Sequence, residues 1–358
     1  MSGSQAGSKR KTGFHFFASR LSAPRFWWRD RPGLLARLLS PLGLVYGAIT
    51  LRRMRKPGAE AGVPVVCVGN FIAGGAGKTP TAIALAGLLR ARGETPFVLM
   101  RGYGGSLPGP VEVDPARHGP TEVGDEAVLM AGHARTVIAR DRVAGAALAR
   151  TRGASVIVMD DGLQNPALAK QLRLAVVDGA SGVGNGLSLP AGPLRAPLAG
   201  QLDCTDAVIV IGPGAAGARV AEAAARQDKA VIAARLEPDG QIAGTLRGRQ
   251  VLALSGIGRP EKFRATLESI GAIIAVERAF GDHHAYSAAD VTSIIAQARS
   301  GDLLVATTEK DMTKLAALWP QSERQRLVVL PVRLVFDAPE RIAKLLETAS
   351  AAAGATQP

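Results

Sequence analysis

Segment 63–93 reads VPVVCVGNFIAGGAGKTPTAIALAGLLRARG and decides the fold that we expect for the chain. It begins with a short apolar run, Val65–Val68, whose β-branched residues predict a buried strand. A glycine-rich turn follows and ends in Lys78-Thr79. Alanines and leucines then recur at helical spacing until Gly93, which is a helix stop signal. Strand, glycine loop, Gly-Lys-Thr and helix together predict a phosphate-binding loop.

The chemistry of this loop favours a nucleoside triphosphate with magnesium. Glycines let backbone N–H groups turn inward, and the helix N-terminus adds a partial positive charge that attracts phosphate. We expect Lys78 to reach the β- and γ-phosphates and the Thr79 hydroxyl to help hold Mg²⁺. The residues expected to contact the nucleotide here are Gly74, Gly75, Ala76, Gly77, Lys78, Thr79 and Pro80.

One feature of the loop departs from the strict motif. The motif places a glycine six residues before the lysine, and Ile72 occupies that position, while Gly74 and Gly75 supply the flexibility. The alternative interpretation is an ordinary glycine-rich β–α turn. The flanking strand and helix favour the phosphate-binding loop.

Composition and charge limit the class of protein. The 358 residues are enough for two domains, and 47% hydrophobic with 20% charged residues suits a globular core. The two cysteines fall in or beside predicted strands, so neither a disulfide framework nor a metal site is expected. Residues 1–56 hold twelve Lys and Arg and one acid, a net +11 of the total +13. Charge confined to one terminal arm argues against a nucleic-acid partner.

The arm at 1–56 carries aromatic residues among arginines, including Phe16, Phe17 and Trp27, before the apolar run Leu34–Leu51. This 18-residue run contains an arginine and a proline, whereas a spanning helix needs about 20 mostly apolar residues. No small-residue cleavage site follows, so a signal peptide is not expected. Aromatics, leucines and a basic collar predict a helix lying in the membrane interface. The alternative is a helical hairpin packed on the protein itself.

A second nucleotide motif follows the predicted strand Ala154–Met159. The strand ends in Asp160-Asp161-Gly162, the Walker-B pattern, in which an acid at the strand tip binds Mg²⁺ directly or through water. We therefore expect Asp160 and Asp161 to join Thr79 in holding the metal. Gln164 lies just beyond and is expected to orient phosphate or substrate.

Two loops between these motifs and after them carry further candidates. Gly124-Asp125-Glu126 precedes a predicted helix, and local pattern leaves open whether its acids act in the site or simply cap the helix. The Gly/Pro-rich segment 184–195 has one charge, Arg195, which suits a phosphate contact. In the second half of the chain, Asp282-His283-His284 holds two of five histidines. Adjacent histidines point apart, which disfavours a zinc site, while a structural loop remains open.

The order of these motifs resembles a known family. GN-(x)₄-GG-x-GKT-P, RGYGG, GDE, DDGLQ, GNG…LPAGPLR, SGIGRPEKF, DHH and TTEKD occur from Val68 to about Lys314, in the order found in the tetraacyldisaccharide 4′-kinase family of lipid A biosynthesis. That family usually has His after the Gln of DDGLQ, and here Asn165 stands there. Asn donates a hydrogen bond but carries no proton at neutral pH, which puts a proton role there in doubt.

The resemblance implies a specific reaction. An ATP- and Mg²⁺-dependent kinase would transfer the γ-phosphate to the 4′-hydroxyl of a tetraacylated glucosamine disaccharide 1-phosphate at the cytoplasmic face of the inner membrane. The resemblance implies a dyad of Asp125 and His283, one from each lobe, with Lys78 and Asp282 as further catalytic residues. Metal ligands are then Thr79, Asp160, Asp161 and Glu126, and Gln164 and Arg195 face the nucleotide.

The expected architecture is α/β and two-lobed: a P-loop NTPase-type α/β/α domain with a smaller α/β domain. We expect the membrane-interface arm at 1–56, the kinase domain at 57–205, the second domain at 206–335, and a C-terminal helix at 336–358 that packs back on the first domain. The chain is expected to be monomeric and peripheral, without nucleic acid. The alternatives are a P-loop GTPase or metallochaperone and a non-enzymatic binder built on the basic arm.

Overall fold

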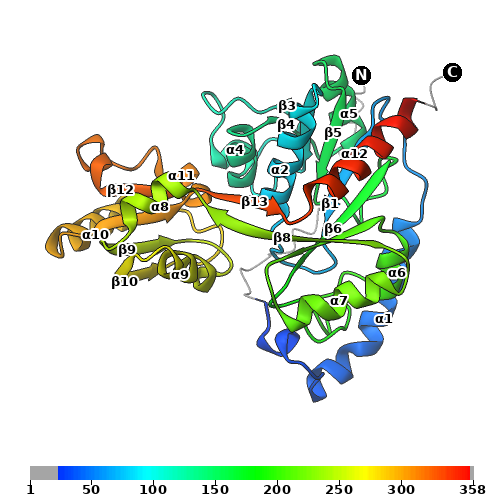
Figure 1. Cartoon of the computed structure of the whole chain (residues 1–358), viewed down its shortest axis with the longest axis horizontal. Helices are drawn as coiled ribbons and strands as arrows, with labels where there is room; N and C mark the ends of the chain where they lie inside the picture. The colour runs from blue at the N-terminus through cyan, green and yellow to red at the C-terminus, as the bar shows by residue number, and fades with distance from the viewer. Residues whose placement is uncertain (1–22, 355–358) are drawn as a thin grey trace, which may run out of the picture.

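The computed structural model describes residues 23–354, so the aromatic residues predicted to anchor the arm at Phe16 and Phe17 lie outside the described part. The strands form two sheets, one of nine strands and one of four (Figure 1). Helices cover both faces of the larger sheet. The expected α/β fold class is confirmed.

The strands of the larger sheet have these bounds: β1 Val65–Gly69, β2 Pro96–Met100, β3 Val111–Glu112, β4 Arg135–Ile138, β5 Val156–Asp160, β6 Leu172–Asp178, β7 Ala207–Ile211, β8 Ala230–Pro238 and β13 Val332–Phe336. The smaller sheet contains β9 Gln250–Ser255, β10 Ile273–Ala279, β11 Leu304–Thr308 and β12 Leu327–Leu330.

The helices begin with the 3₁₀ turn η1 Arg25–Trp28 and the long helix α1 Leu34–Met54. Those of the first half are α2 Lys78–Ala91, α3 Pro120–Val123, α4 Asp125–Ala131, α5 Arg142–Thr151 and α6 Leu198–Asp203. Those of the second half are α7 Ala215–Ala225, α8 Gly240–Leu246, α9 Pro260–Ser269, α10 Ala288–Ser300, α11 Glu309–Leu315, η2 Gln321–Arg326 and α12 Pro339–Gly354.

The larger sheet has the order β13-β8-β7-β6-β1-β5-β2-β4-β3, so the strand that leads into the glycine loop lies at its centre. Its β1 runs parallel to β5 on one side and to β6 on the other. Only the two outer pairs, β13 with β8 and β3 with β4, are antiparallel. In open parallel sheets ligands bind at the carboxyl ends of the central strands. The glycine loop and the Walker-B acids therefore meet at one edge.

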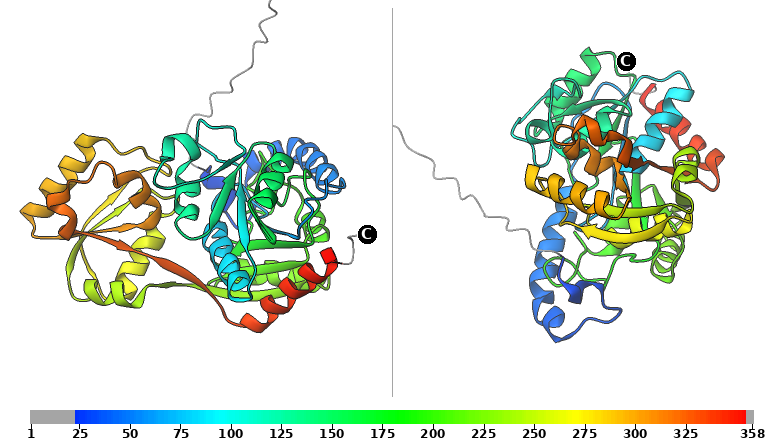
Figure 2. Two further views of the ribbon diagram at one scale, coloured as in Figure 1. Left: turned by 90° about the horizontal axis from the view of Figure 1, so that it is seen from above. Right: turned by 90° about the vertical axis from the view of Figure 1, so that its left-hand side faces the viewer.

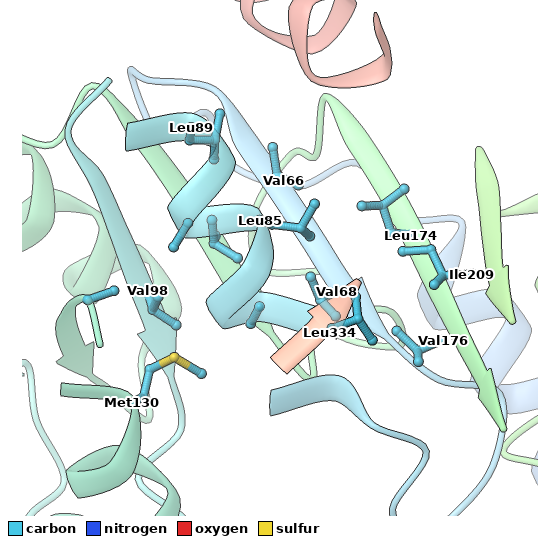
Figure 3. Packing of buried hydrophobic residues seen from close by; sticks show 14 of the residues in the cluster. Val66, Val68, Leu85, Leu89, Val98, Met130, Leu174, Val176, Ile209 and Leu334 are labelled. Atoms are coloured by element: carbon cyan, nitrogen blue, oxygen red, sulfur yellow. The ribbon is translucent and has the colours of Figure 1, made fainter. Parts of the chain in front are cut away.

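The core divides into layers on either side of this sheet. Leu85 and Leu89 of α2 pack against Val66 and Val68 of β1 on one face (Figure 3). Helix α12 adds Ile342, Leu346 and Ala349 to the same buried cluster, which lies over the first domain's sheet. Helices α5 and α7 cover the opposite face in two further clusters. Continuous apolar strands such as β1 are typical of a parallel sheet buried on both faces.

The boundary between the two lobes differs from the predicted one. Strands β7 and β8 continue the larger sheet beyond β6, with Leu174 paired to Ala207 and Ala207 paired to Ala230. A boundary after residue 205 therefore falls inside that sheet. The smaller sheet, of order β10-β9-β11-β12, uses residues 250–330. The chain passes to the smaller sheet after β8 and returns before β13, and these two strands pair antiparallel on the path between the lobes (Figure 2).

Pro331 marks the passage from the smaller sheet back to the larger one. β12 ends at Leu330 and β13 begins at Val332, in the other sheet. Pro331 separates them, and proline has no N–H to donate to a central ladder. On the other crossing, helix α8 follows β8 and leads into β9 of the smaller sheet.

Helix α1 continues through Pro41, which the sequence suggested as an interruption. Proline removes one backbone donor, and the Ser40 hydroxyl donates to the Arg37 carbonyl at 2.8 Å, the acceptor that Pro41 leaves open. The face toward the protein is made of small residues, including Gly43 and Gly47. A Cβ at Gly43 would lie 2.6 Å from the Ser188 carbonyl oxygen, so the helix packs in close backbone contact.

The outward face of α1 is apolar. Its exposed large side chains are Leu34, Leu35, Leu38, Leu42, Leu44, Val45, Tyr46 and Ile49. With 21 residues and a mean hydropathy of 1.6, the helix is also long and apolar enough to cross a membrane by length and composition. Water-exposed leucines on this scale mark a surface that binds something apolar.

Candidate active site

The glycine loop has the backbone that phosphate binding requires. Gly74 and Gly77 have φ values of 126° and 90°, which side chains other than glycine rarely adopt. A Cβ on Gly77 would also lie 2.5 Å from the Ile211 side chain. Asn70 donates to the Gly74 carbonyl at 2.8 Å and holds the loop closed. Helix α2 begins at Lys78, so its free N–H groups face the loop.

Lys78 and Arg195 converge on one carboxylate. The Lys78 Nζ lies 3.5 Å from Asp161 Oδ1, and the Arg195 guanidinium lies 3.3 Å from the same group. Arg195 also donates from Nε to the Ile72 carbonyl at 2.9 Å, which ties the 184–195 segment to the glycine loop. Burial opposes ionisation of Asp161, but the two cations outweigh it and lower its pKa. The site thus gathers two cations where phosphates would bind.

Asp160 provides the observation that fits a magnesium ion. It is 4% exposed, and its Oδ1 is buried with no hydrogen-bond partner among the described residues. Burial raises its pKa to about 7, and nearby Lys78 only partly opposes the rise. A buried, unpartnered carboxylate oxygen at a strand tip suits a hard cation, which prefers oxygen ligands. Thr79 follows Lys78 in the first turn of α2 and offers a hydroxyl on the same loop.

The other predicted metal ligands have partners of their own. Asp161 is engaged by Lys78 and Arg195, and Glu126 lies 3.5 Å from the ammonium of Lys310. Within residues 23–354, no group of three or more His, Cys, Asp or Glu side chains could hold a metal ion. Mg²⁺ in nucleotide sites is commonly held by one or two protein ligands together with phosphates and water. Asp160 with Thr79 matches that pattern.

Gln164 and Asn165 have hydrogen-bond partners within the loops around the site. The Gln164 amide donates to the Asn70 carbonyl at 2.8 Å and to Gln201 at 3.0 Å. Asn165 accepts the N–H of Ala167 at 2.8 Å and so closes the turn after the Walker-B strand. This contact needs an acceptor oxygen and no proton transfer, which an asparagine supplies.

Asp125 and His283 meet across the two lobes. His283 Nδ1 lies 3.0 and 3.1 Å from the two carboxylate oxygens of Asp125. Asp125 begins α4 after Gly124, whose φ of 93° and close approach to the Tyr103 carbonyl favour glycine there. His283 has a φ of 57°, an uncommon value for a non-glycine residue and frequent at functional sites. Tyr103 packs edge-on against the imidazole, 5.9 Å between ring centres.

The contact between Asp125 and His283 shifts the pKa of both groups. Burial opposes ionisation of Asp125, but the hydrogen bond with His283 and the charge of Lys310 outweigh it and lower its pKa. The hydrogen bond to Asp125 raises the pKa of His283, against burial and the charge of Lys310. A histidine oriented by a carboxylate is the usual arrangement for a general base.

The two adjacent histidines have different surroundings. His284 lies 3.3 Å from Asp290 and stacks on Phe280 with ring centres 4.5 Å apart, so it belongs to the second lobe's own packing. Asp282, predicted as catalytic, lies 3.8 Å from His283 Nε2 and 3.2 Å from the Lys310 ammonium. His283 is therefore the histidine that faces the first lobe.

The residues of the TTEKD motif have separate partners on both sides of the contact between the lobes. Thr308 caps α11, and Glu309 lies 3.1 Å from His133 of the first lobe. Lys310 reaches the dyad. Asp311 is fully buried and accepts the Gly256 N–H at 3.0 Å and the Tyr286 hydroxyl at 3.1 Å. Charged residues directly after a parallel strand were the only sequence signal for this contribution.

A second interlobe ion pair was also missed. Asp178, at the end of β6 and 2% exposed, contacts Lys262 and accepts from Arg259 at 2.8 Å. Burial opposes its ionisation, but the two cations lower its pKa to about 2. The Arg259 guanidinium in turn lies 5.7 Å from the ring centre of Trp28 in the N-terminal arm. Through Arg259, the second lobe therefore contacts both the first lobe, at Asp178, and the N-terminal arm, at Trp28.

These features define the class of the protein. A central parallel sheet with a glycine loop, a Walker-B carboxylate and an Asp–His pair beside them is the site of a P-loop phosphotransferase. The chain belongs to the tetraacyldisaccharide-1-P 4′-kinase family, whose sequence profile matches residues 35–350.

Similar proteins agree with this assignment. A tetraacyldisaccharide 4′-kinase of Methylobacterium nodulans is 54% identical over 338 residues, which cover 94% of this chain and 98% of the relative. One of Rhodopseudomonas palustris is 55% identical over 294 residues, 82% of this chain and 87% of the relative. The crystal structure of LpxK from Aquifex aeolicus in complex with ATP shares the fold, with a TM-score of 0.68 at 24% identity over 88% of this chain and 100% of that one.

Proposed function

We propose that this chain is a kinase that uses ATP with Mg²⁺ to phosphorylate the 4′-hydroxyl of the tetraacylated lipid A disaccharide 1-phosphate. The family assignment carries the reaction class and the substrate class. The single structural observation that carries the mechanism is the contact at 3.0 Å between His283 of the second lobe and Asp125 of the first lobe, which also carries the glycine loop.

The phosphate side of the reaction belongs to the glycine loop. Lys78 and the free N–H groups at the start of α2 bind and orient the triphosphate, and Arg195 adds a second positive charge. Asp160 and Thr79 would hold Mg²⁺, which would supply positive charge against the phosphates of ATP. Phosphoryl transfer depends mostly on positioning and on charge stabilisation, so these groups supply most of the rate enhancement.

The acceptor side belongs to the dyad. The neutral imidazole of His283 accepts the proton of the sugar hydroxyl as the oxygen attacks phosphorus. Asp125 orients the ring and stabilises the imidazolium that forms, because its carboxylate is buried and holds Nδ1. Asp282 contributes negative charge on the second-lobe side of the imidazole. Since the two halves of the dyad come from different lobes, separation of the lobes would disable the base and limit ATP hydrolysis by water.

The membrane part of the proposal rests on α1. We infer that the exposed leucines of this helix enter the cytoplasmic face of the inner membrane, with Arg52, Arg53, Arg55 and Lys56 at its end facing anionic headgroups. Small residues hold the inner face of the helix against the segment 184–195. This arrangement supports a peripheral enzyme whose substrate acyl chains lie near the arm, and we propose that the enzyme acts as a monomer.

The experiment that tests the function combines purified protein, Mg²⁺, γ-labelled ATP and detergent-dispersed lipid A disaccharide 1-phosphate. We expect label at the 4′ position, and we expect no label when the acceptor lacks the 4′-hydroxyl. GTP hydrolysis without transfer would instead support a nucleotide-dependent switch and overturn the kinase proposal.

A further inference from the structure

Lys310 occupies an unusual position at the contact between the lobes. Its side chain is 18% exposed, and its ammonium lies 3.4 Å from Nε2 of His283. The same ammonium lies 3.2 Å from Asp282 in the second lobe and 3.5 Å from Glu126 in the first. One cation therefore contacts the imidazole and a carboxylate of each lobe.

The contact with the imidazole has a chemical consequence. An ammonium group only donates hydrogen bonds, so Nε2 must present its lone pair to Lys310. The ring proton must then reside on Nδ1, where Asp125 accepts it through two oxygens at 3.0 and 3.1 Å. The other groups facing this ring are Asp282 and the edge of Tyr103, and neither offers Nε2 a second donor.

The carboxylates keep Lys310 in place and charged. Burial alone would lower its pKa, but Glu126, Asp282 and Asp125 outweigh burial and raise the pKa. Because the two nearest carboxylates belong to different lobes, the ammonium reaches its full set of partners only when α4 and α11 are adjacent. Lys310 thus couples lobe closure to the state of the imidazole.

We propose that Lys310 is a positioning residue that fixes His283 as the neutral Nδ1–H tautomer: its ammonium holds the Nε2 lone pair in the free protein, and the acceptor hydroxyl replaces the ammonium at that lone pair in the reaction. This inference rests on the proposed function for its kinetic consequence only. The tautomer itself is a property of the free protein. Lys310 belongs to the second lobe, so the base is correctly prepared only after the lobes meet.

The direct test is ¹⁵N NMR of the histidine side chains in the full-length protein without substrate. The expected wild-type spectrum shows His283 with a protonated Nδ1 and an unprotonated Nε2. Lys310→Met should give a mixture of tautomers or a protonated ring at the same neutral pH. A wild-type ring with the proton on Nε2 would overturn the proposal, whether or not the protein proves to be a kinase.

A matched control separates tautomer control from simple interlobe contact. Glu309 precedes Lys310 on α11 and also crosses to the first lobe, through His133, but does not contact the dyad. Glu309→Gln should therefore leave the His283 spectrum unchanged. If Glu309→Gln alters the spectrum as Lys310→Met does, loss of lobe contact explains both and the proposed role of Lys310 is wrong.

Kinetics give a second, independent readout. Lys310→Met should lower kcat about tenfold or more with little change in the KM for ATP, because the glycine loop is untouched. Lys310→Arg keeps a donor-only cation and should restore part of the loss, and its thermal stability controls for misfolding. A fall in kcat that Arg does not relieve, with an unchanged His283 spectrum, would contradict the proposal. If no variant or wild type transfers phosphate, the proposed function fails while the tautomer result still stands.

Discussion

The outward face of α1 gives the prediction with the clearest magnitude. Leu38 and Leu42 are 68% and 60% exposed and lie one turn apart. Full burial of a leucine side chain stabilises by about 1.5–3 kcal/mol, so the exposed parts of both together contribute about 2 to 4 kcal/mol when they enter lipid. Replacing both with serine should weaken membrane binding roughly 30- to 700-fold, since each 1.4 kcal/mol is a factor of ten.

Sedimentation with vesicles that contain anionic phospholipid measures this change as a partition coefficient. Ile273→Ser is the matched control, because Ile273 is 53% exposed but lies on β10 of the second lobe. The control should bind as the wild type does. Equal binding by the double-serine variant and the wild type would refute the inference that α1 docks on the bilayer. Loss of binding by Ile273→Ser as well would show that partitioning is not specific to the arm.

Three further predictions concern the site and the interlobe contacts. Asp125→Asn should lower kcat about 10²- to 10³-fold with ATP affinity nearly unchanged. His283 acts as a base only while it is neutral, and Asp125 raises its pKa. In the kcat–pH profile of Asp125→Asn the acid limb should therefore move to lower pH, because the pKa of His283 falls when Asp125 is neutralised. Lys78→Ala should damage both kcat and the KM for ATP; equal losses of ATP affinity in the two variants would contradict the separate roles. Asp178→Asn should lower the free energy of unfolding in urea by about 2 kcal/mol at pH 7. Asp178 has a folded pKa of about 2 against about 3.9 unfolded, so its contribution is present above pH 4 and disappears as pH falls toward 2, and a deficit that persists at pH 2 would argue against this ion pair.

Local chemistry made the phosphate-binding parts predictable. The Gly-Lys-Thr turn and the Walker-B acids depend on short spacings within one β–α unit, and the structure brings Lys78 and Asp161 within 3.5 Å. The α/β class followed from repeated buried strands. What periodicity does not specify is which sheet a strand joins, because pairing depends on residues far apart in the chain. Strands β7, β8 and β13 therefore joined the larger sheet against the predicted boundary.

The missed residues share a physical cause. Lys310 and Asp178 lie at strand ends in different lobes, and each has a partner in the other lobe that is far away in the sequence: Glu126 is 184 residues from Lys310, and Arg259 is 81 residues from Asp178. Short charged motifs at strand ends resemble ordinary helix caps, so nothing local distinguishes them. In helix α1, by contrast, a local sequence signal was present and was overlooked. Its leucines and the basic residues after them predicted a surface that faces the membrane. The spacing of Gly43 and Gly47 marks the other face, which packs on the protein.

The measurement that tests the central claim most directly is a double-variant cycle on Asp125 and His283. Rates of label transfer to the 4′-hydroxyl are compared for the wild type, Asp125→Asn, His283→Gln and the double variant. If the two residues form one general base, the double variant should be no slower than the more damaging single one. Losses that multiply in the double variant would show that the two side chains act independently, and the interlobe dyad would then not be the catalytic base.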